Sequence, residues 1–261
     1  MNQRIVILLS SLLLAATQVW AQYPFDRFCT PAKKAFSNWI ESISDPGVVG
    51  ERRMSKIDLC DVFPHGDTCA LVLSDSSDDN IVGTTDIKVL RNSVLMQEFN
   101  SEQILFNAQI FSDCPVFVAD YNGDGEPDIK FSGWYGGTGL AGLNRRIIYL
   151  LQDQNHHFTK VSFLDMNVIE ERDLDSNDHF AIVTMNLSQF NNHSYWTFNL
   201  YRIADDDLVS VSDRYGYPKF IQYLFRENYK VVPGIADSIR HQFCLPKPPD
   251  YLKDNGTIFD Q

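Results

Sequence analysis

Short apolar runs separated by turn-forming residues dominate the chain from about residue 55 to residue 213. Many of the runs are rich in Val, Ile, Phe and Tyr, which is typical of β-strands. Three pairs of runs predict β-hairpins: 86–99, turning at Arg91-Asn92; 146–151 with 158–163; and 194–201 with 208–212. Because the connections leave no room for a helical crossover, we expect the strands to be antiparallel.

Helical periodicity occurs near the two ends of the chain. Thr30 and Pro31 are the residue types of an N-cap and a first helical turn, and apolar residues then recur at helical spacing to about Ser44. A shorter helix is predicted over 235–243. The predicted fold class is therefore mainly β: an antiparallel meander, an open barrel or a propeller-like sheet, with an N-terminal helix and a short C-terminal helix.

Residues 1–21 have the pattern of a secretory signal peptide, with an apolar stretch (5–16) and a small residue, Ala21, at the expected cleavage site. The stretch is short for a membrane span, although an N-terminal membrane anchor is the alternative interpretation. A signal peptide predicts a periplasmic or secreted protein. The remainder is expected to comprise a helical segment (22–54), a β-rich calcium-binding domain (55–245) and a loose tail (246–261).

The charge of the chain limits its partners. Asp and Glu number 34 against 22 Lys and Arg, which gives a net charge of −12 at pH 7. Such a charge disfavours nucleic acid and anionic membrane surfaces and favours cations and basic partners.

The five cysteines are Cys29, Cys60, Cys69, Cys114 and Cys244. In an oxidising compartment we expect two disulfides and one free thiol. Joining Cys60 to Cys69 and Cys29 to Cys244 is one pairing among several, and the spacing does not select it.

The segment from Asp120 to Asp128 reads D-Y-N-G-D-G-E-P-D. Its acidic and amide residues alternate around a glycine with the oxygen spacing of a calcium-binding loop. The predicted ligands are the side chains of Asp120, Asn122, Asp124 and Asp128 and the backbone carbonyl of Glu126. The alternative interpretation is an acidic turn held by hydrogen bonds to its own Asp and Asn side chains.

The residues around this loop identify the kind of calcium loop. An EF-hand needs flanking helices and a glutamate at its twelfth position, which is Phe131 here. The flanks, 116–119 and 129–131, are short β-branched and aromatic runs that predict strands. The strand–loop–strand arrangement resembles the calcium loop of FG-GAP or VCBS-type repeats, found in integrin-like propellers and many exported bacterial proteins. This resemblance implies a Ca²⁺ site and says little about function.

The acidic loop has a second, weaker version. Asp120, Asn122 and Asp124 recur as Asp173, Asp175 and Asn177, and later strand positions recur too. Residues 120–162 and 173–212 are therefore predicted to be two copies of one unit, with chance β-periodicity as the alternative. The second loop lacks the glycine, so we expect weak calcium binding or none. Asp205-Asp206-Asp207 is interpreted as a solvated turn.

A glycine-rich segment follows the calcium loop. It matches G-x-G-x-x-G at 137–142, but a strand and not a helix follows, so we interpret it as a flexible loop and not a dinucleotide site. Residues 120–158 also resemble a family of small periplasmic proteins that inhibit lysozyme-like peptidoglycan hydrolases or confer immunity to such effectors. That resemblance implies that Ser132, Gly133 and Tyr135 enter the hydrolase cleft. Alternatively, the neighbouring aromatic residues belong to the core or its rim.

Two function classes remain open on the sequence. The first is an exported, calcium-binding, non-enzymatic protein of the cell envelope, in its sharpest form a periplasmic inhibitor of a peptidoglycan hydrolase or an immunity protein. The alternative is a secreted glycan-acting hydrolase in which calcium is structural, since carboxylates distant in sequence can meet in a cleft. The chain contains no G-x-S-x-G, H-E-x-x-H or catalytic-cysteine signature, so we expect a protein without enzymatic activity.

Overall fold

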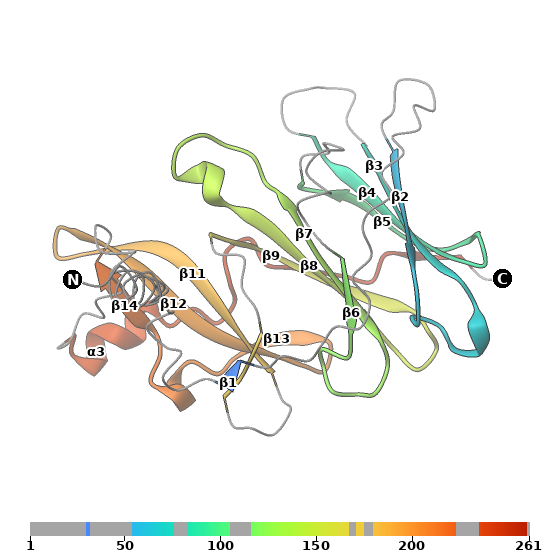
Figure 1. Cartoon of the computed structure of the whole chain (residues 1–261). Helices are drawn as coiled ribbons and strands as arrows, with labels where there is room; N and C mark the ends of the chain where they lie inside the picture. Colours follow the sequence, from blue (N-terminus) through green and yellow to red (C-terminus); the bar gives the residue numbers. More distant parts are fainter. Residues whose placement is uncertain are drawn as a thin grey trace, which may run out of the picture.

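The computed structural model describes residues 30–31, 54–75, 83–104, 116–166, 171–174, 180–222 and 235–259. Its strands form three antiparallel sheets (Figure 1). The first sheet contains β2 (Met54–Leu59), β3 (Cys69–Asp75), β4 (Thr85–Arg91), β5 (Val94–Glu102) and β16 (Thr257–Ile258). The second contains β6 (Phe117–Ala119), β7 (Asp128–Trp134), β8 (Arg145–Gln152), β9 (Phe158–Asp165) and β15 (Leu252–Asp254). The third contains β1 (Thr30–Pro31), β10 (Arg172–Asp173), β11 (Phe180–Phe190), β12 (His193–Ala204), β13 (Asp207–Ser210) and β14 (Lys219–Gln222).

Each sheet is built on a meander of four strands that follow one another in the chain: β2 to β5, β6 to β9 and β10 to β13. Short helical turns complete the described structure: η1 (Pro64–Gly66), η2 (Ala141–Leu143), η3 (Asp213–Tyr215), α3 (Asp237–Arg240) and η5 (His241–Phe243). The mainly β, antiparallel class is therefore confirmed, and so is a short helix near the C-terminus. None of the three sheets closes on itself among the described strands.

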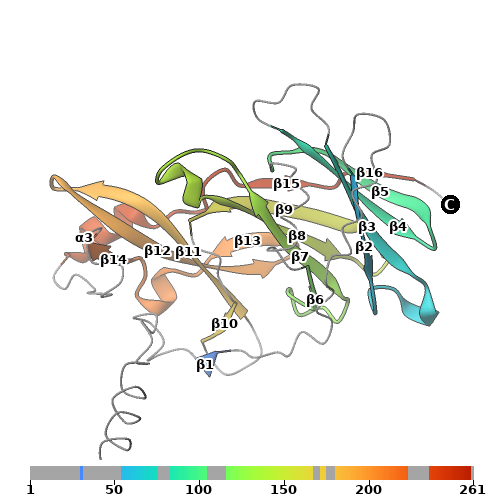
Figure 2. The ribbon, with the colours of Figure 1, turned by 45° about the horizontal axis from the view of Figure 1, so that its top comes forward.

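The second sheet lies between the other two (Figures 1 and 2). Its strands β7, β8 and β9 are buried along almost their whole length. Ile129, Phe131 and Ile148 pack with the first sheet in one core cluster. Tyr149 and Phe163 pack with the third sheet in a second cluster. Burial on both faces explains the continuous apolar run in β8, because a strand covered on one face would alternate with polar residues.

The predicted hairpins form. Strand β8 pairs with β9, and β12 pairs with β13 across the Asp205-Asp206 turn. The β4–β5 hairpin turns at Asn92-Ser93, one residue later than predicted. Both turn residues adopt positive φ angles (52° and 67°). Two successive positive φ angles suit the right-handed twist of a tight hairpin.

The N-terminal helix is not supported. Thr30–Pro31, its expected first turn, forms strand β1, which pairs with Asp173 and Arg172 of β10. A proline is tolerated in such an edge position because its missing N–H is not needed by the sheet. The rest of the expected helix, the signal segment 1–21, Cys29 and Cys114 lie outside the described residues. No helix in the described part is long and apolar enough to cross a membrane.

The C-terminal tail differs from the loose segment that was expected. Strand β15 pairs with β9 and strand β16 pairs with β5, so the tail crosses from the second sheet to the first (Figure 2). Between them, Gly256 adopts a φ of 63°, and a Cβ at this position would lie 2.6 Å from the carbonyl oxygen of Glu98. This approach of two backbones requires glycine.

The described cysteines, Cys60, Cys69 and Cys244, are free thiols, so neither Cys60–Cys69 nor Cys29–Cys244 forms. Strand pairing gives the reason for the first pair. Cys69 is the cross-strand partner of Leu59 and shares its buried face, whereas Cys60 is exposed. Because successive strand residues point to opposite faces, the two thiols do not face each other.

Candidate functional site

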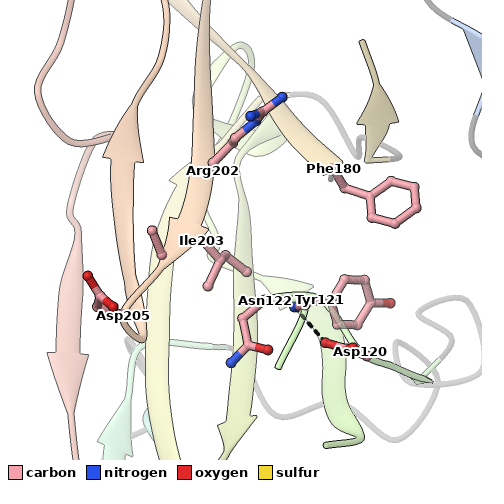
Figure 3. A pocket seen from close by; sticks show the side chains of 9 residues that line it. Asp120, Tyr121, Asn122, Phe180, Arg202, Ile203 and Asp205 are labelled. Carbon is pink, nitrogen blue, oxygen red and sulfur yellow. Dashed lines mark hydrogen bonds between the residues drawn. The ribbon is translucent and has the colours of Figure 1, made fainter. Parts of the chain in front are cut away.

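The acidic loop Asp120–Asp128 connects β6 to β7 at the edge of the second sheet. Its neighbour in space is the β12–β13 turn of the third sheet, and the two enclose a surface hollow of about 370 Å³ (Figure 3). Asp120, Tyr121 and Asn122 line the hollow from one side, and Ile203 and Asp205 line it from the other. The loop is therefore placed where two consecutive sheets meet.

Asp120 organises the first half of the loop. Its carboxylate accepts hydrogen bonds from the backbone N–H of Gly123 (2.6 Å) and of Gly125 (3.0 Å). These glycines have φ angles of 85° and 94°, which other residues rarely adopt. The loop thus curls around the side chain at its first position.

Asn122 and Asp124 continue this arrangement. The Asn122 Oδ1 atom accepts from the N–H of Asp124 (3.1 Å), and Asp124 Oδ1 accepts from the N–H of Glu126 (2.8 Å). The Asn122 amide nitrogen donates to Asp124 Oδ2 (3.0 Å) and to Asp206 Oδ1 (3.2 Å). The second contact joins the loop to the neighbouring hairpin.

Asp128 closes the loop from within the core. Its side chain is fully buried, and its two oxygens accept from the N–H groups of Tyr121 and Gln152, both at 2.8 Å. Burial raises the pKa of Asp128 to about 8. The two backbone N–H groups oppose this shift, while the negative charges of Asp124 and Asp120 add to it. A carboxyl group with this pKa holds a proton more readily than a solvated one, so a metal ion would have to displace that proton.

Asp206 is a member of this site that the sequence pattern did not predict. It belongs to the β12–β13 hairpin, which is far from the loop in sequence, and acidic turns are usually solvated. Asp205 and Asp206 both have φ angles of 53°, as a two-residue turn between β12 and β13 demands. The signal in the sequence was the unusual density of acidic residues in this turn.

The site residues predicted for calcium are brought together in one loop, but their side chains are directed at backbone N–H groups. Within the described ranges, no three His, Cys, Asp or Glu side chains are gathered so that they could hold a metal ion. The geometry is that of an acidic turn held by its own Asp and Asn side chains. A carboxylate has about four lone-pair positions, so an oxygen that accepts one such bond can still bind a cation. The residue types therefore fit calcium, and the ion itself stays a prediction.

Two of the three residues predicted to enter a partner's cleft are not on a loop. Ser132 and Gly133 lie within β7, paired with Ile147 and Arg146, and both are buried. A Cβ on Gly133 would lie 2.8 Å from Ile104, so the glycine permits packing against that side chain. Tyr135 is half-buried and follows the end of β7. The exposed part of this connection is 137–141, so a partner would meet that segment first.

Two groups of charged side chains are buried in the described core. In one, Glu171 lies 2.5 Å from Lys130 Nζ and accepts from the hydroxyl of Tyr149 (2.6 Å). In the other, Glu102 is 2.6 Å from Arg146 Nε and 2.8 Å from Lys160 Nζ. Glu171 has one basic partner in the core and Glu102 has two, so removing either glutamate would leave a buried positive charge without its partner.

Comparisons of the chain with protein-family models, with curated proteins and with solved structures find no match.

Proposed function

We propose that this chain is an exported, non-enzymatic binding protein of the cell envelope and that its loop 120–128 binds Ca²⁺. One observation carries the calcium part: three carboxylates, those of Asp120, Asp124 and Asp206, belong to one loop and the turn beside it, with the buried carboxyl group of Asp128 behind them. None of the three forms an ion pair with Lys or Arg in the described part of the chain. Uncompensated negative charge favours a cation, and the loop has the oxygen spacing that calcium requires.

The proposal is tested by titrating CaCl₂ into chelator-treated protein in a calorimeter and by measuring the melting temperature with CaCl₂ and with EDTA. We expect heat of binding and a higher melting temperature with calcium, because a ligand that binds only the folded state stabilises it. Asp124→Ala should remove both effects. Asp58→Ala is the matched control, because its side chain is 77% exposed and lies on β2 in another sheet. An unaltered melting temperature with no heat of binding in the wild type would refute the calcium site.

The sharper form of the proposal is inhibition of a peptidoglycan hydrolase, with 137–141 as the segment that meets the enzyme. Its support is the resemblance of 120–158 to periplasmic inhibitors and the exposure of this segment, where Leu140 is 38% exposed. The test is a panel of muramidases incubated with excess protein. Full muramidase activity and no complex on a sizing column would exclude this form and leave calcium binding untouched.

Three of the buried carboxylates give no support to the hydrolase alternative. A glycan hydrolase needs two carboxyl groups facing a sugar in a cleft. Glu102 and Glu171 are instead enclosed in the core with basic partners, and Asp128 accepts backbone hydrogen bonds with both oxygens.

A further inference from the structure

One face of the third sheet carries a row of polar side chains, in which Asn186 is half-buried and the other members are buried. Asn186 on β11 and Thr197 on β12 are direct cross-strand partners, so their side chains lie on the same face. Asn199, two residues after Thr197, shares that face. Thr197 and Asn199 are both 0% exposed. A polar row in this position is unusual, because the same face carries apolar residues of the second core cluster further along β12.

The C-terminal segment covers this row. The N–H of Leu245 donates to Asn199 Oδ1 (3.2 Å), and the hydroxyl of Tyr201 donates to the carbonyl oxygen of Leu245 (3.0 Å). The ring of Phe243 packs against Phe220, the β14 partner of Thr197, with centroids 5.2 Å apart. Figures 1 and 2 both place α3, which leads into this segment, beside β14. The row is thus enclosed between β12 and residues 243–245.

Three atoms of the row have no hydrogen-bond partner in the part of the chain that the structure describes: Asn186 Oδ1, Thr197 Oγ1 and Asn199 Nδ2. They are an acceptor, a hydroxyl that can donate and accept, and a donor. Direct cross-strand partners are about 5 Å apart, and residues two apart on a strand are about 7 Å apart. A molecule the size of water can bridge atoms at such separations, whereas the side chains alone do not meet.

We propose that this row is a buried hydration site, in which ordered water accepts from Asn199 Nδ2, donates to Asn186 Oδ1 and bonds the Thr197 hydroxyl. The water joins the polar row to the C-terminal segment above it and satisfies groups whose burial would otherwise oppose folding. The site takes a small neutral hydrogen-bonding ligand and is independent of the calcium loop. It also explains why polar side chains occupy an enclosed face of the sheet.

The substitution Thr197→Val tests the proposal by the sign of its effect. Valine keeps the shape of threonine and removes the hydroxyl. In a hydrated row the substitution leaves the water with fewer partners, so the melting temperature should fall by about 2–4 °C. In a dry row it removes an unsatisfied hydroxyl, so the melting temperature should rise. Thr184→Val is the matched control, because the Thr184 hydroxyl already bonds Tyr201 and its loss should destabilise the protein in either case.

A direct observation keeps the test decisive if a variant fails to fold. In a crystal structure of the wild-type protein, we expect electron density for water within about 3.2 Å of Asn186 Oδ1 and Thr197 Oγ1. Continuous protein density in that space, or a melting temperature raised by Thr197→Val, would overturn the hydration site. Both outcomes are measured without calcium and without a partner, so neither depends on the proposed function.

Discussion

Replacing Glu102 by glutamine should cost this protein more stability than any other single charge removal in the described core. The Glu102 side chain is 0% exposed, and it has two cationic partners, Arg146 and Lys160, at 2.6 and 2.8 Å. It also accepts from the hydroxyl of Ser162 at 3.1 Å. Glutamine keeps the shape of the side chain but leaves two buried cations with less negative charge. Removing one partner of a buried ion pair costs about 3–5 kcal/mol.

The same substitution should loosen the C-terminal tail. Arg146 also donates to the carbonyl oxygen of Asp250 (2.7 Å), and Lys160 also pairs with Asp254 (3.2 Å). Both basic side chains are positioned by Glu102, so the tail should lose its anchors together with the glutamate. Hydrogen exchange should then show faster exchange of the β15 amides than of the β8 amides.

The assay is urea unfolding at pH 7, with the free energy of unfolding taken from the midpoint and the slope. Glu98→Gln is the control, because Glu98 forms a single partly exposed pair with Lys88 and should cost about 1 kcal/mol or less. A loss below about 1 kcal/mol for Glu102→Gln would refute the reasoning, since it would mean that water or rearrangement compensates the buried cations.

The pH dependence of the wild type gives an independent check. Burial raises the pKa of Glu102, but Lys160 and Arg146 outweigh burial and hold that pKa below its ordinary value. A pKa lowered on folding contributes stability above the pKa of an unfolded glutamate, about 4.3. This stability is lost as the pH falls through the pKa of the folded state. Glu102→Gln should therefore flatten the acid limb of the stability curve.

Two further predictions concern the tail and the loop. In urea unfolding, Gly256→Ala should lower the free energy of unfolding much more than Gly139→Ala. Both glycines have positive φ angles (63° and 61°), but an added Cβ meets backbone and ring atoms only at Gly256. Equal losses would mean that only the backbone strain of a positive φ angle is measured. In metal-free protein, the pKa of Asp128 is raised to about 8, whereas the pKa of an unfolded aspartate is about 3.9. The stability that this shift contributes is fully present below pH 3.9 and is lost as the pH rises through 8. Asp128→Asn should remove that loss from the stability curve between pH 5 and 9, and an unchanged slope would contradict it.

The hairpins could be predicted because their determinants are local. In β8 and β9, and in β12 and β13, the strand residues and the polar turn between them lie within one short stretch of sequence. The position of Ser132 and Gly133 could not be predicted in this way. A Ser-Gly pair before further glycines is typical of a loop, yet both residues pair with β8. Ile104, which is distant in sequence, packs against Gly133 where a larger residue would not fit.

The tail shows the same limit. Its prolines and polar residues predict a loose segment, and no residue within 246–261 indicates a partner. The tail is held by residues of two other strands. The side chain of Gln97 on β5 donates to the carbonyl oxygen of Asn255 (2.6 Å), and the backbone N–H of Leu164 on β9 donates to the carbonyl oxygen of Pro249 (2.9 Å). Contacts of such long sequence separation follow from the packing of two complete sheets, which local propensity does not encode.

The candidate site combines a local and a non-local part. Asp120, Asn122 and Asp124 could be found from spacing, because one loop contains them all. Asp206 joins them only because the third sheet packs on the second, and the Asn122 amide then lies between the carboxylates of Asp124 and Asp206. An ion bound among these oxygens would attract both the loop and the turn, so calcium would stabilise the contact between sheets as well as the loop. Calcium-dependent protection from hydrogen exchange should therefore extend to the β12–β13 turn, and protection confined to 120–128 would show that the loop acts alone.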